Sequence, residues 1–260
     1  MSDVLAPLSG AIVGFLLGLL GGGGSIVAVP LLLYVVGVGS VHVAIGTSAL
    51  AVGVNAFANL IGHARSGNVK WPCAIVFAAA GVIGAYLGST AGKSVGGDRL
   101  LFLFALVMLA VGAAMLRPKA QGGDPDVRIN PGIAVRLVAI GLLTGAVSGF
   151  FGIGGGFLIV PGIMLGSGMP ILNAVGSSLF SVGAFGLTTA INYALSGLVD
   201  WRLAAEFIAG GIAGGFLGIK LGTKLAARKR ALNVVFAGTI FLVALYMLVR
   251  SAGAMFAWSL

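Results

Sequence analysis

The sequence predicts an all-α polytopic membrane protein made of two inverted repeats, each with a glycine-broken re-entrant half-helix pair and three transmembrane helices. Composition is the first reason: 59% of the 260 residues are hydrophobic and only 8% are charged, too few to cover a water-soluble surface. The second is that the apolar residues form stretches long enough to cross a bilayer as helices. The third is that these stretches repeat. Composition therefore excludes soluble enzymes, nucleic-acid-binding proteins and extracellular modules.

Eight apolar segments follow one another along the chain, separated by turn residues or charges. The longest polar interruption, 118–131, predicts a flexible connector between a first membrane repeat at 1–117 and a second at 132–260. The apolar segments lie at 4–36, 42–64, 72–92, 100–116, 133–168, 171–196, 201–222 and 231–249.

The two halves are similar in sequence at a nearly constant offset. Residues 18–30 match 149–161 at six of 13 positions, and residues 46–92 match 176–222 at 18 of 47 positions. Trp71 and Trp201 are among the aligned identities, and shared composition accounts poorly for such matches. Duplicated halves are a common plan of secondary transporters.

The first apolar segment of each half has an unusual length. Residues 4–36 would form a helix of about 50 Å, against a hydrocarbon core of about 30 Å. Glycines interrupt it at 21–24 and interrupt its counterpart at 154–156. We therefore expect two half-helices that enter and leave on one side. Three full crossings then remain in each half. Because three is odd, the second half starts on the opposite side of the membrane and is inverted relative to the first.

The distribution of Lys and Arg favours the same topology. If all eight segments cross, one side carries 8 of these residues and the other 7; if the first and fifth are re-entrant, the counts become 4 and 11. The positive-inside rule expects such a bias. We predict that both termini lie outside and that the connector at 117–131 is cytoplasmic. The smaller group consists of Lys93, Arg99, Arg202 and Arg250.

The two glycine-rich breaks are candidate anion sites. Half-helix N-termini present free N–H groups and the positive end of the helix dipole, and glycine lets a ligand approach the backbone. A tight packing turn without a ligand is the alternative. The candidate residues are Gly22, Gly23, Gly24 and Ser25 in the first half, and Gly154, Gly155 and Gly156 in the second.

Polar side chains gather in the segment after each break. They are Thr47, Ser48, Asn55, Asn59 and His63 in the first half, and Ser177, Ser178, Ser181, Thr188, Thr189 and Asn192 in the second. Such groups either hydrogen-bond between helices or line a polar path. The aligned ones are the substrate-binding candidates, because pseudo-symmetry would bring them to one site. These are Thr47 and Ser48 with Ser177 and Ser178, and Asn59 with Thr189.

His63 and Glu206 are candidates for proton coupling. An interfacial histidine is the alternative for His63. For Glu206 the alternative is a helical ion pair with Arg202, four residues earlier.

Glycines spaced by four predict close helix packing, within one chain or between two copies in a homodimer. They are Gly84, Gly88 and Gly92, and Gly210, Gly214, Gly218 and Gly222. The stretch 88–94 resembles a phosphate-binding loop but is one residue short and follows no strand, so we exclude ATP-driven transport by this chain alone. One cysteine and two histidines predict no metal site, and no cofactor or catalytic set is evident.

The paired motifs resemble the TauE/SafE family of membrane permeases over nearly the whole chain. They are 21–25 with Pro30, 152–156 with Pro161, the Gly-Thr-Ser and Gly-Ser-Ser triplets at 46–48 and 176–178, and the following tryptophans. The resemblance implies export of sulfite or an organosulfonate such as sulfoacetate across the bacterial inner membrane. Gly156 stands where the first motif has Ser25, so one hydroxyl is absent from the second.

The leading hypothesis is therefore a non-enzymatic secondary transporter that binds a small sulfur anion between the breaks and alternates access. Residues alone support an anion; the resemblance alone points to sulfur. A passive anion channel, a carrier of another small anion such as a carboxylate, and a membrane scaffold or enzyme subunit are the alternatives. The expected partners are the anionic substrate and the lipid bilayer, with no nucleic acid.

Overall fold

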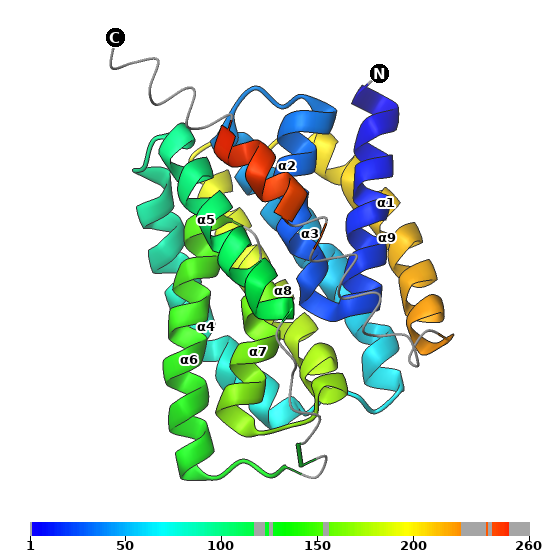
Figure 1. Cartoon of the computed structure of the whole chain (residues 1–260), viewed down its shortest axis with the longest axis vertical. Coiled ribbons are helices and arrows are strands. Elements are labelled where there is room, and N and C mark those ends of the chain that lie inside the picture. Colours follow the sequence, from blue (N-terminus) through cyan, green and yellow to red (C-terminus); the bar gives the residue numbers. More distant parts are fainter. Residues whose placement is uncertain are drawn as a thin grey trace.

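The computed structural model describes residues 2–116, 123–124, 127–152, 156–224, 238 and 241–249. Throughout these residues the regular structure is helical (Figure 1). The elements are α1 (Ser2–Leu20), η1 (Gly21–Val27), α2 (Ala28–Pro30), η2 (Leu31–Val36), α3 (Val41–Arg65), α4 (Trp71–Lys93), α5 (Gly97–Leu116), α6 (Pro131–Phe151), α7 (Gly156–Ser167), α8 (Ile171–Ala194) and α9 (Trp201–Lys224).

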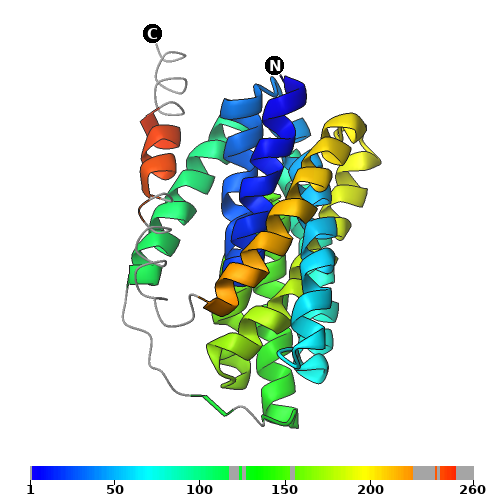
Figure 2. The ribbon, with the colours of Figure 1, turned by 90° about the vertical axis from the view of Figure 1, so that its right-hand side faces the viewer.

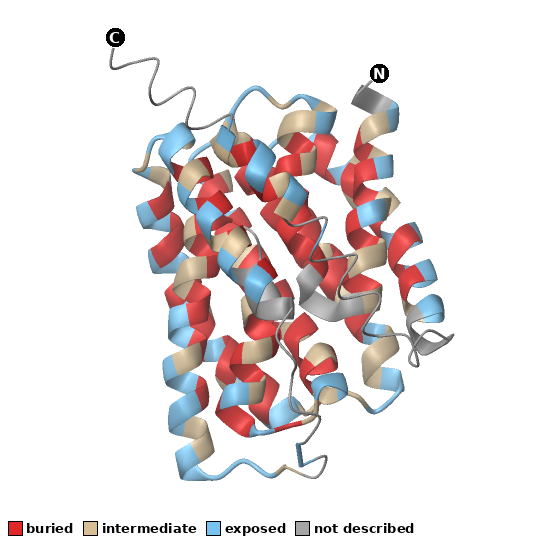
Figure 3. Ribbon diagram, viewed as in Figure 1, coloured by how far each residue is buried: buried red, intermediate tan, exposed pale blue. Residues whose placement is uncertain are grey.

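Five helices among the described residues, α3, α4, α6, α8 and α9, are long and apolar enough to cross a membrane. Their outward faces carry large apolar side chains, for example Leu143, which is 67% exposed, and Ile191, which is 61% exposed. Exposed positions follow the outer helices in Figure 3, while buried residues fill the inside. A surface of this kind suits lipid rather than water, so the predicted all-α membrane protein is confirmed.

Both long apolar segments are interrupted at their glycines. In the first, α1 ends at Leu20, a 3₁₀ turn η1 carries the four glycines, and the chain continues through α2 and the π-helical η2. In the second, α6 ends at Phe151 and is capped by Gly152, whose φ of +66° glycine adopts easily, and α7 begins at Gly156. In Figure 1, α1 and α6 start at opposite ends of the molecule and stop near its middle.

Two pairs of parallel helices pack with their backbones in contact. A Cβ at Gly14 of α1 would meet the carbonyl oxygen of Gly211 of α9, and one at Gly145 of α6 would meet that of Gly81 of α4. The predicted close packing is confirmed, and it lies within one chain. The further contacts are Gly10 with Phe207, Gly18 with Gly215, Gly210 with Pro7, Gly214 with Ala11, Gly218 with Phe15, Gly84 with Leu142, Gly88 with Ala146, Gly92 with Phe150, Gly141 with Phe77 and Gly149 with Ala85.

Helices α3 and α8 cross at the centre and run antiparallel. Gly46 packs against Tyr193, whereas Phe57, three turns further along α3, packs against Gly183. Gly53 faces Gly183 and Gly186 between these two points. Residue numbers therefore rise along α3 as they fall along α8, although the two helices occupy equivalent positions in the sequence repeat.

The remaining elements cover one side of this bundle. Helix α5 and the helical turns at 241–249 lie together in Figure 2, and Phe241 packs against Gly112 of α5. The stretch resembling a phosphate-binding loop runs along α4 up to Lys93, so it forms a helix rather than a loop.

Candidate functional site

The first glycine-rich break packs against the helix that follows the second break. The first break, η1, packs against both α7 and α8, and α7 is the helix that follows the second break. Gly24 and Ser25 are completely enclosed in η1, and a Cβ at Gly152 would overlap the side chain of Ile45 on α3. Gly22 and Gly23 belong to η1 and Gly156 opens α7. Gly154 and Gly155 lie outside the described residues.

The two aligned serines after the breaks are enclosed on the central helices. Ser48 of α3 donates through Oγ to the carbonyl oxygen of Ile45 at 2.9 Å and lies 3.5 Å from that of Gly152, beside the second break. Ser178 of α8 donates to the carbonyl oxygen of Val175 at 2.8 Å. Both side chains are 0% exposed. Rotation about the Cβ–Oγ bond would turn either hydroxyl toward a ligand.

The other aligned hydroxyls have a structural partner. Thr47 Oγ1 accepts a hydrogen bond from the backbone N–H of Asp200 at 3.0 Å, and Ser177 Oγ accepts one from that of Lys70 at 2.9 Å. Each bond holds the start of α9 or α4 against α3 or α8. These oxygens therefore orient helices, and their role in binding an anion stays a prediction.

Besides the phenol of Tyr193, three enclosed hydroxyls have no hydrogen-bond partner within the described protein. They belong to Ser148 of α6, Ser181 of α8 and Thr189 of α8, and all three residues are 0% exposed. Helix α6 ends at the second break, and α8 packs against η1. The comparison of the repeats missed Ser148 because its counterpart at an offset of 131 is Leu17. Its position one turn before a glycine break is the signal that could have found it.

An amide and imidazole stripe follows α3 on the face toward α1 and α9. Asn59 Nδ2 donates to the carbonyl oxygen of Asn55 at 2.8 Å, and its side chain packs against Gly18 and Gly215. The side-chain amide of Asn55 and both ring nitrogens of His63 are enclosed without a hydrogen-bond partner. Asn59 of α3 therefore lies beside Gly18, which is one turn before the first break along α1. His63 lies one turn further along α3.

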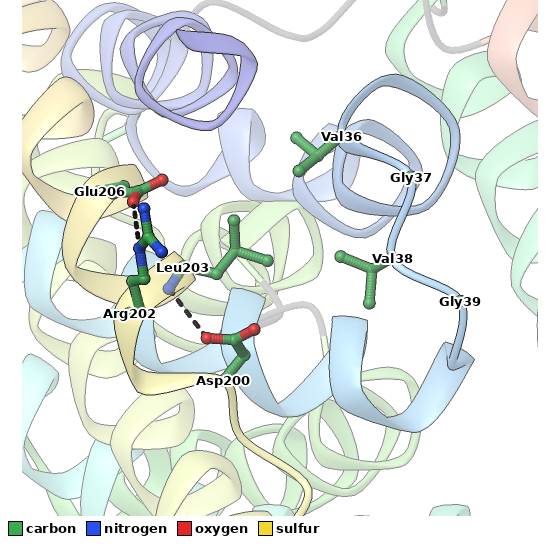
Figure 4. Close-up of a pocket in the computed structure, with 8 residues that line it drawn as sticks. All are labelled: Val36, Gly37, Val38, Gly39, Asp200, Arg202, Leu203 and Glu206. Carbon is green, nitrogen blue, oxygen red and sulfur yellow. Dashed lines mark hydrogen bonds and ion pairs between the residues drawn. The ribbon is translucent and has the colours of Figure 1, made fainter. Parts of the chain in front are cut away.

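Glu206 lies away from the breaks, at the end of the bundle where α9 begins. Its Oε1 is 3.1 Å from Nε of Arg202, so the ion pair between these residues is present. Both residues line an open cavity of about 360 Å³ between the start of α9 and the turn at 36–39 (Figure 4). Asp200 also lines it and caps α9 by accepting from the N–H of Leu203 at 3.0 Å.

The membrane-crossing helices and the lipid-suited surface define a multi-pass α-helical membrane protein. The sequence of residues 6–247 matches the family described as Sulfite exporter TauE/SafE. The chain therefore belongs to the TauE/SafE family of membrane transporters. No solved structure matches it.

Similar proteins from bacteria and an archaeon cover most of the chain. A "Probable membrane transporter protein" of Xylella fastidiosa (strain 9a5c) is 54% identical over 244 residues, covering 94% of each chain. The "Probable membrane transporter protein YunE" of Bacillus subtilis (strain 168) is 28% identical, over 81% of this chain and 85% of its own. The "Probable membrane transporter protein MJ0441" of Methanocaldococcus jannaschii is 30% identical, over 77% of this chain and 74% of its own.

Proposed function

We propose that the chain is a secondary transporter that exports a small sulfur oxyanion or organosulfonate, such as sulfite or sulfoacetate. The observations that support the proposal are that the first break packs against α7 and α8, and that α6 and α8 carry enclosed hydroxyls without a hydrogen-bond partner in the described protein. An unpaired hydroxyl in a water-free interior is energetically unfavourable unless a ligand or a water molecule forms a hydrogen bond with it. The choice of a sulfur anion as the substrate comes from the family description, which names a sulfite exporter.

In this proposal backbone N–H groups of 22–25 and 154–156 bind the oxygens of the anion. Ser48, Ser178, Ser148 and Ser181 add hydroxyl donors from α3, α6 and α8. Thr47, Ser177, Asn59 and Thr189 complete the surroundings of the site. Hydroxyl and amide donors in a water-poor interior bind an oxyanion more strongly than they would in water.

We further propose that the halves are inverted repeats, each opening with a re-entrant pair. The antiparallel crossing of α3 and α8 supports inversion, since a repeat axis along the membrane normal would leave equivalent helices parallel. In the second half, the N–H of Asp124, before α6, donates to the carbonyl oxygen of Gly168, after α7, at 3.1 Å. In the first half, the start of α1 and the turn at 36–39 both lie beside the first part of α9.

We place the protein in the inner membrane with both termini outside and the connector at 117–131 in the cytoplasm. In Figure 1 the start of α1 and the described part of the connector lie at opposite ends. A tag on either terminus should be accessible to a membrane-impermeant reagent in intact spheroplasts. Access only after permeabilisation would overturn the orientation.

For proton coupling we favour His63 over Glu206, because the Glu206 carboxylate already has Arg202 as its partner. His63 carries two unpaired ring nitrogens on the stripe that leads to the first break. His63→Gln should keep anion counterflow but lose accumulation driven by a pH gradient. Equal gradient-driven accumulation in this variant and the parent protein would exclude the role.

Counterflow of labelled sulfite into proteoliposomes tests the function. Internal unlabelled sulfite or sulfoacetate should drive uptake, and internal acetate should not. Uptake with acetate would identify a broader carboxylate carrier, and unsaturable flux without counterflow would identify a channel. Absence of flux with every anion would refute transport of these anions.

Two kinds of substitution test the site. Gly23→Leu should abolish counterflow, whereas Gly39→Leu, in a turn where an added Cβ meets nothing within 4 Å, should preserve it. Ser148→Ala and Ser181→Ala break no hydrogen bond, so they should slow transport without lowering stability. Thr188→Ala is the matched control on α8, because the Thr188 hydroxyl bonds to its own helix at Ala184. Normal transport in both serine variants would remove them from the site.

A further inference from the structure

We infer that the moving parts of this transporter are two bodies that each combine helices from both sequence halves. The first body consists of α1, η1, α2, η2, α3 and α9, and the second of α4, α6, α7 and α8. The inference rests on the proposed transport function, because it specifies how the site between the breaks would open. Movement of one sequence half against the other is the arrangement that it replaces.

Backbone packing joins helices across the halves. In the first body α1 contacts α9 through Gly10, Gly14 and Gly18. In the second body α6 contacts α4 through Gly141, Gly145 and Gly149. Contact between backbones leaves no flexible side chain to absorb a shift, so each pair moves as a unit. Separating the sequence halves would break both contacts at once.

Hydrogen bonds join the same partners. The Thr47 hydroxyl of α3 holds the N–H of Asp200 at the start of α9, inside the first body. The Ser177 hydroxyl of α8 holds the N–H of Lys70 at the start of α4, inside the second.

A third set of bonds fastens the other end of α4 to α8. Lys93 Nζ donates to Asn192 Oδ1 at 2.8 Å and to Ser196 Oγ at 2.9 Å. Asn192 Nδ2 donates to Ser89 Oγ at 2.6 Å and to Thr90 Oγ1 at 2.9 Å. The second body is therefore bonded at both ends of α4, and a shift of α4 carries α8 with it.

We call the contact between the two bodies the seam, and its polar contacts differ from those within each body. Where α3 crosses α8, Gly53 and Ala49 meet Gly183 and Gly186, and Phe57 covers Gly183. None of these side chains carries a hydrogen-bond donor or acceptor. A bond that does cross the seam, from Ser48 Oγ to the carbonyl oxygen of Gly152, is long at 3.5 Å. Backbones meet there too, but only over about one turn, and sliding at this crossing leaves no side-chain polar group of these residues unpaired.

The seam also contains the candidate site. The first break belongs to the first body, and the second break joins α6 to α7 in the second body. Because η1 packs against α7 and α8, a shift of one body relative to the other changes the separation of the two breaks. Sliding at the α3–α8 crossing would thus open the anion site toward one face and close it toward the other.

Spin-label distances across the molecule test the two bodies. Cysteines are placed in a Cys73→Ala background at four exposed positions: Leu8 and Ile61 in the first body, Leu87 and Val135 in the second. The pairs 8–61 and 87–135 lie within a body, and the pairs 8–135 and 61–87 lie between bodies. All four pairs join opposite ends of the bundle, which makes them matched controls. Distances are measured in proteoliposomes with and without sulfite.

We expect single, unchanged distances within each body, and two distances or a shifted distance between bodies. The inference is overturned if the within-body distances change as much as the others, or if no pair changes. Between-body distances that are double but do not respond to sulfite would support the bodies and count against sulfite as the substrate. This outcome separates failure of the proposed function from failure of the inference.

Discussion

Gly14→Ala should destabilise the protein by separating α1 from α9. The new Cβ would lie 2.6 Å from Cα of Gly211, whereas carbon atoms pack best at about 3.5–4.0 Å. The helices must move apart by about 1 Å, which forfeits part of the dispersion energy along the interface. Overpacking of this kind costs about 1–3 kcal/mol. With about 2–4 °C per kcal/mol for a chain of this size, the unfolding midpoint should fall by about 2–12 °C.

The protein carries its own probe for this measurement. Cys73 is 1% exposed and is the sole cysteine, so a fluorogenic maleimide reports unfolding of the detergent-solubilised protein on heating. Gly145→Ala, at the equivalent contact between α6 and α4, should lower the midpoint similarly. Gly39→Ala has nothing within 4 Å of its Cβ and should leave the midpoint unchanged. A Gly14→Ala midpoint equal to that of Gly39→Ala would refute backbone contact between α1 and α9.

Three more predictions concern polar contacts. Ser177→Ala leaves the N–H before α4 without an acceptor and should cost about 1–3 kcal/mol in the thermal assay; no loss would show that water replaces the hydroxyl. Lys93→Met removes the charged donor bound to Asn192 and should cost about 1–3 kcal/mol, with Lys93→Arg recovering part of the midpoint. Glu206→Gln breaks an exposed pair with Arg202 and should change stability by less than about 1 kcal/mol; a larger loss would indicate further contacts.

Apolar length and the positions of glycines predicted most helix limits among the described residues, but not the length of α6, which at Pro131–Phe151 could cross a membrane although a re-entrant half-helix was expected. Helices α3 and α4 each extend one residue beyond the predicted segments at both ends, and the breaks fall at the expected glycines. These features are local, because the burial of one helix and the flexibility of one glycine are properties of short stretches. The re-entrant pairs, the inversion and the domain limits stay predictions.

The partners of each helix could not be read from the sequence. Spacing by four shows that Gly84 lies on a small-residue face, but it does not show that this face meets α6 from the other half. For the same reason the sequence did not distinguish Thr47 and Ser177, whose oxygens hold helix starts, from Ser148 and Ser181, whose hydroxyls have no partner. A hydroxyl's role depends on long-range neighbours, which only the folded chain supplies.

Packing is nearly symmetric between the halves, whereas the chemistry beside it is not. Gly211 and Gly81 occupy equivalent places, yet the first faces the amide of Asn55 and the second the ring of Phe185. A turn or two further on, α3 carries an imidazole at His63 where α8 carries a phenol at Tyr193. The amides and imidazole of α3 therefore have aromatic rings as their counterparts on α8. The proposed anion site draws on groups that the halves share, the glycine-rich breaks and the aligned serines, whereas the coupling candidate His63 lies where the halves differ.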